Sequence, residues 1–156
     1  MSTLVVDELN PGVQFDQKVK IARDINVSHI RPWVYIQSPL VDGDFKLTVL
    51  QGATELATSI INYVDINAAM TEAYFHGYLR FDFDSLFLGV AQGNTEEEYT
   101  FRFEMINSNF NSTFFLAVCR IWDIRFYDIY GTGVVAGEPP NDMVEPAGLE
   151  IYEYKK

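Results

Sequence analysis

The chain has 156 residues, 48% hydrophobic and 15% aromatic, which is long enough for one domain with a sizeable buried core. Its 22 acidic and 11 basic residues give a formal net charge of -11, and such a field repels phosphate backbones and anionic lipid surfaces. Composition and charge therefore argue against a protein that binds nucleic acid or a membrane surface. The abundance of Phe and Tyr favours an all-β domain.

Residues 1–12 are predicted to be an extended arm or a first edge strand, because a short apolar stretch precedes the Pro11-Gly12 turn signal. The sharper interpretation is an arm that pairs with a neighbouring subunit. No basic segment followed by a long apolar segment is present, so we expect no classical signal peptide. No stretch approaches the roughly 18 apolar residues of a membrane helix. Residues 13–156 are predicted to form a single domain.

Alternation of apolar and polar residues predicts several strands in the first third of the chain. Residues 15–27 are expected to form one half-exposed strand, with Arg23 interrupting its apolar face. Residues 33–37 are expected to form a second strand, which begins after Pro32. A turn at residues 42–44 then precedes a further strand.

The middle of the chain contains one ambiguous segment and one clear strand. The spacing of residues 53–66 fits either a helix or a strand, and its cluster of β-branched residues favours a strand. Residues 67–74 are expected to form one short helix or a loop. Residues 78–84 alternate cleanly, which predicts a strand whose outward side chains include Asp82 and Asp84.

The densest stretch, residues 99–130, predicts three strands. The first, over residues 99–105, has the period-2 pattern of a sheet with one buried and one solvated face. The second is apolar on both faces as far as Arg120, which indicates a central strand covered on both sides or a strand covered by a loop. The side chains that we expect to be buried here are Phe101, Phe103, Phe115, Ala117 and Cys119.

Residues 131–148 are rich in Gly and Pro and predict a long loop, which in a compact domain is often functional or interfacial. The last eight residues predict a closing strand whose terminal Lys155 and Lys156 protect an edge. The predicted strands number about eight to ten, which fits two packed antiparallel sheets in a β-sandwich of the jelly-roll type.

Residue types that support catalysis or metal binding are few. His29 and His76 are the only histidines, and their spacing matches no zinc motif. Cys119 is the single cysteine, so no intrachain disulfide forms, and its apolar surroundings indicate a structural thiol. Asp42 and Asp44 are candidate calcium ligands, although the later bidentate Glu of an EF-hand is missing. We therefore expect a non-enzymatic protein without a required cofactor.

Two kinds of carbohydrate site remain open as alternatives. A glycoside-cleaving enzyme would use a carboxylate pair, such as Asp82 with Asp84 or two of residues 96–98. A sugar-binding module would instead stack sugar rings on exposed aromatic side chains flanked by polar groups. Most of these aromatic residues are nevertheless expected to fill the core of the sandwich or its subunit interfaces, where aromatic side chains are abundant. The candidate sugar-binding residues are Trp122, Asp123, Arg125, Tyr127 and Trp33.

Four segments, FKLTVLQG (45–52), YFHGYLRFDFDSLFLG (74–89), EEEYTFRFEM (96–105) and FFLAVCRIWDIRFYDIYG (114–131), resemble in their order the jelly-roll modules of bacteriophage virion proteins and of carbohydrate-binding modules. The resemblance implies a virion component made in the host cytoplasm, either a capsid decoration or a tail-associated protein, that assembles with itself and with other virion proteins. The alternative that it implies is a glycan-binding module. It carries over no catalytic residue.

A chain that assembles in this way is expected to contact its neighbours through the N-terminal arm and the long Gly- and Pro-rich loop. The candidate interface residues are Leu4, Val5, Val6, Val134, Val135, Met143 and Val144.

Overall fold

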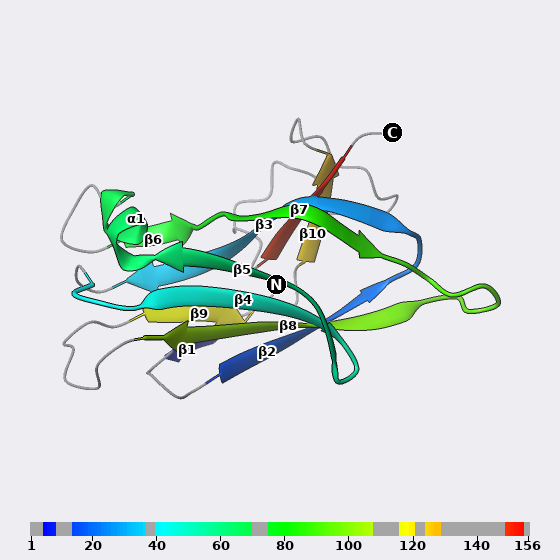
Figure 1. Cartoon of the computed structure of the whole chain (residues 1–156), viewed down its shortest axis with the longest axis horizontal. Helices are drawn as coiled ribbons and strands as arrows, with labels where there is room; N and C mark the ends of the chain where they lie inside the picture. Colours follow the sequence, from blue (N-terminus) through cyan, green and yellow to red (C-terminus); the bar gives the residue numbers. More distant parts are fainter. Residues whose placement is uncertain are drawn as a thin grey trace.

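The computed structural model describes residues 5–8, 14–36, 40–69, 75–107, 116–120, 124–128 and 149–154, which form two packed β-sheets (Figure 1). The eleven strands within these ranges are β1 (Val5–Glu8), β2 (Gln14–Ile21), β3 (Ile25–Ile36), β4 (Asp44–Gln51), β5 (Thr54–Asn62), β6 (Phe75–Tyr78), β7 (Phe81–Leu88), β8 (Glu97–Ile106), β9 (Leu116–Arg120), β10 (Ile124–Asp128) and β11 (Leu149–Glu153), and the helix is α1 (Tyr63–Ala68). The prediction of a two-sheet β-sandwich is confirmed. No helix in these ranges is long and apolar enough to span a membrane.

The smaller sheet has four strands in the order β2-β8-β4-β5, and all of its pairings are antiparallel. The larger sheet has seven strands, in which β3 pairs with β9 and β11, and also with β6 and β7. The chain crosses from the smaller to the larger sheet between β2 and β3, and it crosses back between β7 and β8. In the smaller sheet β2 pairs with β8, and in the larger sheet β3 pairs with β7. Two strand pairs therefore wrap side by side around the sandwich, as in a jelly roll.

The expectation of one strand over residues 15–27 is wrong. A turn at residues 22–24 separates β2 from β3, and the two strands belong to different sheets. The turn is held by long-range contacts, because the Arg23 guanidinium donates to both oxygens of Glu153 at 3.0 and 2.8 Å. A carboxylate oxygen of Asp24 also accepts the backbone N–H of Val90 at 2.8 Å.

The expectation that a new strand begins after Pro32 is also wrong, because β3 runs through this proline. Along one edge of β3, the residues up to Ile30 pair with β7, and the residues from Trp33 onward pair with β6. Pro32 lies between these two pairings, so its missing N–H removes no hydrogen bond to β6 or β7. Its carbonyl accepts the backbone N–H of Leu79 at 3.2 Å.

The ambiguous segment contains both a strand and a helix. β5 confirms the strand prediction as far as Asn62, whose side chain then caps α1 by accepting the backbone N–H of Val64 at 3.1 Å. The prediction of a strand through Val64 and Ile66 is therefore wrong, since both residues are helical. The helix also begins earlier than the expected residues 67–74 and ends at Ala68, while residues 70–74 lie outside the described ranges.

The closing strand β11 is not the edge strand that we expected. It lies between β3 and β10, and its pairing with β10 is parallel, which is an exception to the antiparallel prediction. Parallel neighbours require a connection of about a dozen residues or more, and residues 129–148 supply that length of chain between β10 and β11. The need for a long connection accounts for part of the unusual length of the Gly- and Pro-rich segment.

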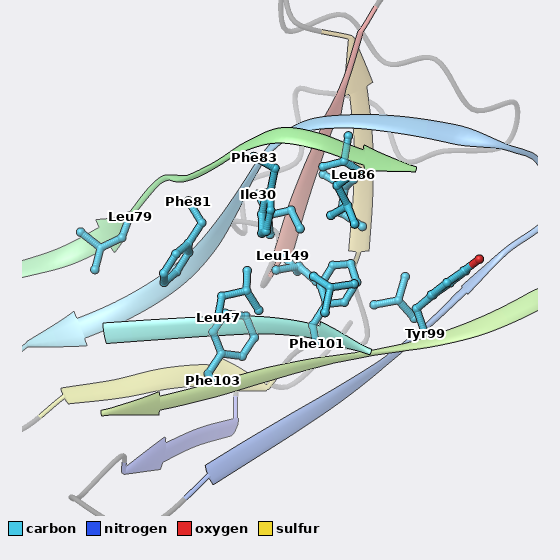
Figure 2. Packing of buried hydrophobic residues seen from close by; sticks show 14 of the residues in the cluster. Ile30, Leu47, Leu79, Phe81, Phe83, Leu86, Tyr99, Phe101, Phe103 and Leu149 are labelled. Atoms are coloured by element: carbon cyan, nitrogen blue, oxygen red, sulfur yellow. The ribbon is translucent and has the colours of Figure 1, made fainter. Parts of the chain in front are cut away.

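Inward side chains of both sheets form one hydrophobic core (Figure 2). At its centre, the Phe45 ring lies 5.0 Å from the ring of Phe81 and 5.9 Å from that of Phe103, measured between centroids. Phe101 and Phe103 are buried as predicted. Phe115 lies outside the described ranges, and only the backbone of Ala117 and Cys119, in β9, is described.

Replacing Phe101, which is 0% exposed, by Ala is expected to lower the free energy of unfolding by about 3–5 kcal/mol, because the substitution leaves a cavity in the core. The matched control is Phe87→Ala, since this ring is 55% exposed and its loss is expected to change stability by no more than about 0.5 kcal/mol. Urea unfolding of both variants measures the difference. Equal effects would contradict the described core.

Candidate functional site

The β2–β3 turn and the β7–β8 connection lie at the end of the sandwich that is toward the right in Figure 1. A pocket of about 320 Å³ is lined by residues from this turn, from this connection and from β4, β5, β7 and β8. We call it the end pocket. Its lining combines carboxylates with aromatic and aliphatic side chains, and the residues that define it are Asp24, Leu56, Phe87, Gly89, Glu97 and Tyr99.

Tyr99 connects the end pocket to the core. Figure 2 shows its ring at one end of the buried cluster, with the hydroxyl group pointing away from the other side chains. The hydroxyl donates a hydrogen bond to the carbonyl oxygen of Gly89 at 2.5 Å. Burial raises the pKa of Tyr99, and the nearby carboxylates of Glu97 and Asp24 raise this pKa further, although the bond to Gly89 opposes them. The hydroxyl therefore remains protonated and holds the β7–β8 connection in place.

Backbone and side-chain donors fix the two carboxylates of the end pocket. Asp24 Oδ1 accepts the N–H of Val90, and Glu97 Oε1 accepts a bond from Asn94 Nδ2 at 2.7 Å and a longer one from the N–H of Ala91 at 3.4 Å. Within the described residues, neither Asp24 Oδ2 nor Glu97 Oε2 accepts a hydrogen bond. Each carboxylate is thus anchored by one oxygen and leaves the other available.

The strand period separates Glu97 from its acidic neighbours. Glu98 points to the outer face of the smaller sheet, where its carboxylate lies 3.8 Å from Lys18 Nζ, and the Glu96 carboxylate lies 3.7 Å from Lys20 Nζ. Glu97 points the other way, toward Tyr99 and the end pocket. Among the described residues, neither Glu97 nor Asp24 takes part in an ion pair.

Exposed apolar side chains border the end pocket. Phe87 from β7 is 55% exposed and Leu56 from β5 is 39% exposed. A Cβ atom added at Gly89 would lie 2.7 Å from Cε1 of Phe87, so the ring rests directly against the backbone of this glycine. Further apolar exposure follows β5 into α1, with Ile60 at 52% and Val64 at 56%. We call Leu56, Ile60 and Val64 the β5–α1 surface.

A second polar cluster lies on the larger sheet, on the side away from the core. The His29 ring stacks on Tyr152 with centroids 4.3 Å apart, and its Nδ1 lies 3.1 Å from Ser28 Oγ. Arg31 donates to the Tyr152 hydroxyl at 3.1 Å and lies 3.3 Å from Glu150 Oε1. His29, Glu150 and Tyr152 are buried, so this cluster joins β3 to β11 through satisfied polar groups.

Burial, together with Arg80 and Arg31, lowers the pKa of His29 to about 4, against the opposing effect of Asp82. An imidazole with so low a pKa is a weak base near neutral pH, which makes it poorly suited to activating the Ser28 hydroxyl. Sequence patterns did not identify this cluster, because they did not pair β3 with β11.

The predicted sugar-binding residues are only partly within the described chain. Trp122 and Asp123 lie outside it, and Trp33, Arg125 and Tyr127 are described by their backbone alone. β11 separates Trp33, on β3, from the two residues on β10. Among the aromatic rings that line the end pocket, the exposed one is that of Phe87. Sequence reasoning missed it because it precedes the loop at the end of β7 and carries no motif.

The predicted interface residues are likewise divided. Val5 and Val6 lie in β1, where they pair with Arg120 and Cys119 of the same chain. The other members of the set lie outside the described ranges, and they are Leu4, Val134, Val135, Met143 and Val144.

Of the candidate calcium ligands, Asp42 lies in the turn before β4 and Asp44 is the first residue of that strand. Asp44 accepts hydrogen bonds from Asn107 Nδ2 at 2.8 Å and Asn62 Nδ2 at 2.9 Å, and these two bonds lower its pKa. Its carboxylate thus ties the turn to β5 and to the end of β8. Among the described residues, no group of three or more His, Cys, Asp or Glu side chains is placed to hold a metal ion.

Comparisons with protein-family models, with curated proteins and with solved structures found no match to this chain. The geometry of the end pocket and of the β5–α1 surface therefore carries the functional argument.

The buried His29 is expected to make stability depend on pH. As pH falls below the ordinary pKa of 6.5, the unfolded chain takes up a proton before the folded protein, whose His29 pKa is about 4. The stability contributed by the neutral imidazole is complete above pH 6.5 and is lost progressively down to about pH 4. The total loss in unfolding free energy is up to about 1.4 kcal/mol for each unit by which the two pKa values differ. His29→Gln should show a smaller loss of unfolding free energy between about pH 7 and about pH 5, measured by urea titration. Parallel slopes for the two proteins would contradict this assignment.

Proposed function

We propose that this chain is a non-enzymatic structural protein of the bacteriophage virion type, a capsid decoration or tail-associated protein, that acts through contacts between subunits. The observation that carries the proposal is the β5–α1 surface. Leu56, Ile60 and Val64 are exposed along the last strand of the smaller sheet and the helix that follows it. Exposed apolar side chains along a terminal strand are typical of protein–protein contacts.

The two edge strands of the smaller sheet differ in how strongly their side chains oppose pairing with a strand of another molecule. β2, at one end of the strand order, presents Asp16, Lys18 and Lys20 outward, and charged side chains of this kind oppose strand addition. β5, at the other end, has Glu55 as its single charged residue. Two copies can therefore bring their β5 strands together without placing many like charges opposite each other, despite the net charge of -11.

A second copy of this chain is accordingly the occupant that we propose for the β5–α1 surface, and attachment to other virion proteins would use the remaining faces. The carbohydrate-binding alternative stays a prediction, since its leading residues Trp122 and Asp123 lie outside the described ranges. A glycan array with the purified full chain distinguishes the two functions, because a saccharide response would favour the alternative.

Ile60→Asp is expected to convert a defined oligomer of the full chain into monomers, measured by light scattering. The new carboxylate would lie opposite Lys46 on the neighbouring strand, so it should not destabilise the subunit. Tyr154→Asp is the matched control, because Tyr154 is similarly exposed, at 46%, and follows β11 in the other sheet.

A wild-type chain that is monomeric at all accessible concentrations would contradict the proposal, and so would an oligomer that persists in the Ile60→Asp variant. Point substitutions are preferable to removing residues 1–12, because that deletion would also remove β1 from its pairing with β9.

A further inference from the structure

We propose that the end pocket receives an arginine side chain of a partner protein. The inference deepens the proposed function, on which it rests for the presence of a protein partner. Three features of the pocket carry it: two carboxylates that form no ion pair with any described residue, an exposed aromatic ring at the border, and a volume suited to one side chain.

The first feature is a local excess of negative charge. All Lys and Arg residues whose side chains are described form ion pairs with carboxylates outside the end pocket. Even Arg23, adjacent to Asp24 in the chain, donates both of its bonds to Glu153. The seven cations in these pairs are Lys18, Lys20, Arg23, Arg31, Lys46, Arg80 and Arg102. The charges of Asp24 and Glu97 are therefore not neutralised by any described cation.

The second feature is the arrangement of acceptors and ring. Asp24 and Glu97 are each held by one oxygen, so the other oxygen can accept N–H bonds from a ligand without disturbing the loop. The Phe87 ring borders the same pocket and is more than half exposed. A guanidinium group both donates several hydrogen bonds in a plane and stacks on an aromatic face, whereas an ammonium group is a compact point charge. The lining thus favours arginine over lysine.

The third feature is size. A volume of about 320 Å³ lies at the lower end of the roughly 300–1,000 Å³ range of small-molecule sites, which suits a single side chain better than an extended ligand. The described cations of a second copy are already paired within their own chain. Because the seven described cations are paired in this way, an arginine that a different protein presents to the end of the sandwich is the occupant that we propose.

The test is a titration of the nitrogen-15-labelled full chain with acetyl-arginine amide, followed by the NMR signals of the backbone amides of Val90 and Ala91. We expect saturable shifts of these two signals. Acetyl-citrulline amide, which is neutral and of similar shape, should produce none. Acetyl-lysine amide should bind more weakly than the arginine derivative, because it lacks the planar donor array.

Asp24→Asn combined with Glu97→Gln keeps the acceptors for Val90 and Asn94 but removes both charges, and it should weaken arginine binding by about tenfold or more. The matched control is Glu96→Gln combined with Glu98→Gln, which removes two charges from neighbouring positions whose side chains pair with Lys20 and Lys18. This control should change binding by less than about twofold, because exposed pairs of this kind contribute little.

Absence of shifts with the arginine derivative would overturn the inference, and so would an equal loss of binding in the two double variants. Shifts of the same two signals by saccharides but not by arginine would assign the pocket to sugar instead. The oligomeric state of the wild-type chain is measured as well, because it tests the proposed function independently of arginine binding. A wild-type oligomer that does not bind arginine would overturn the pocket assignment alone, whereas a monomer that binds arginine would support the pocket and contradict assembly through β5.

Discussion

The pairing of β3 with four other strands is the constraint on which the rest of the structure depends. This strand of twelve residues has β7 and β6 along one edge and β11 and β9 along the other. The change from β7 to β6 falls at Pro32, the one position of β3 that has no N–H to donate. β3 also follows β2 through the turn that contains Asp24. The position of β3 in the larger sheet therefore fixes the side of the end pocket that Asp24 lines.

Electrostatic pairing follows from this strand arrangement. On the outer face of the smaller sheet, Arg102 on β8 binds both oxygens of Asp16 on β2, and Lys46 on β4 lies 4.0 Å from Glu104 on β8. Such exposed pairs contribute little to stability individually, at most about 1 kcal/mol each. These pairs and those of the larger sheet together occupy all seven described cations, so Asp24 and Glu97 form no ion pair within the described part of the chain. The fold therefore separates a self-neutralised face from a negatively charged pocket with an apolar border.

Features set by local alternation could be predicted from the sequence, and features set by long-range contacts could not. The period-2 pattern predicted β8 and the burial of Phe101 and Phe103. It also predicted a strand over residues 78–84, whereas β7 spans Phe81–Leu88 and Tyr78 belongs to β6. The break between β2 and β3 was missed because Arg23 and Asp24 are held by Glu153 and Val90, which are distant in sequence. β11 was mistaken for an edge strand because nothing local indicates its parallel partner. The end pocket was missed for the same reason, since the turns and strands that form it are separate in the chain.

The central claim, that the chain assembles through β5 and α1, is tested most directly by hydrogen–deuterium exchange of the full chain in its assembled and diluted states. Assembly should slow backbone exchange in peptides that cover Thr54–Asn62 and Tyr63–Ala68, and leave Gln14–Ile21 on the charged strand β2 unchanged. Slower exchange in β2 but not in β5 would contradict the account, and so would an assembled state with no change in either strand.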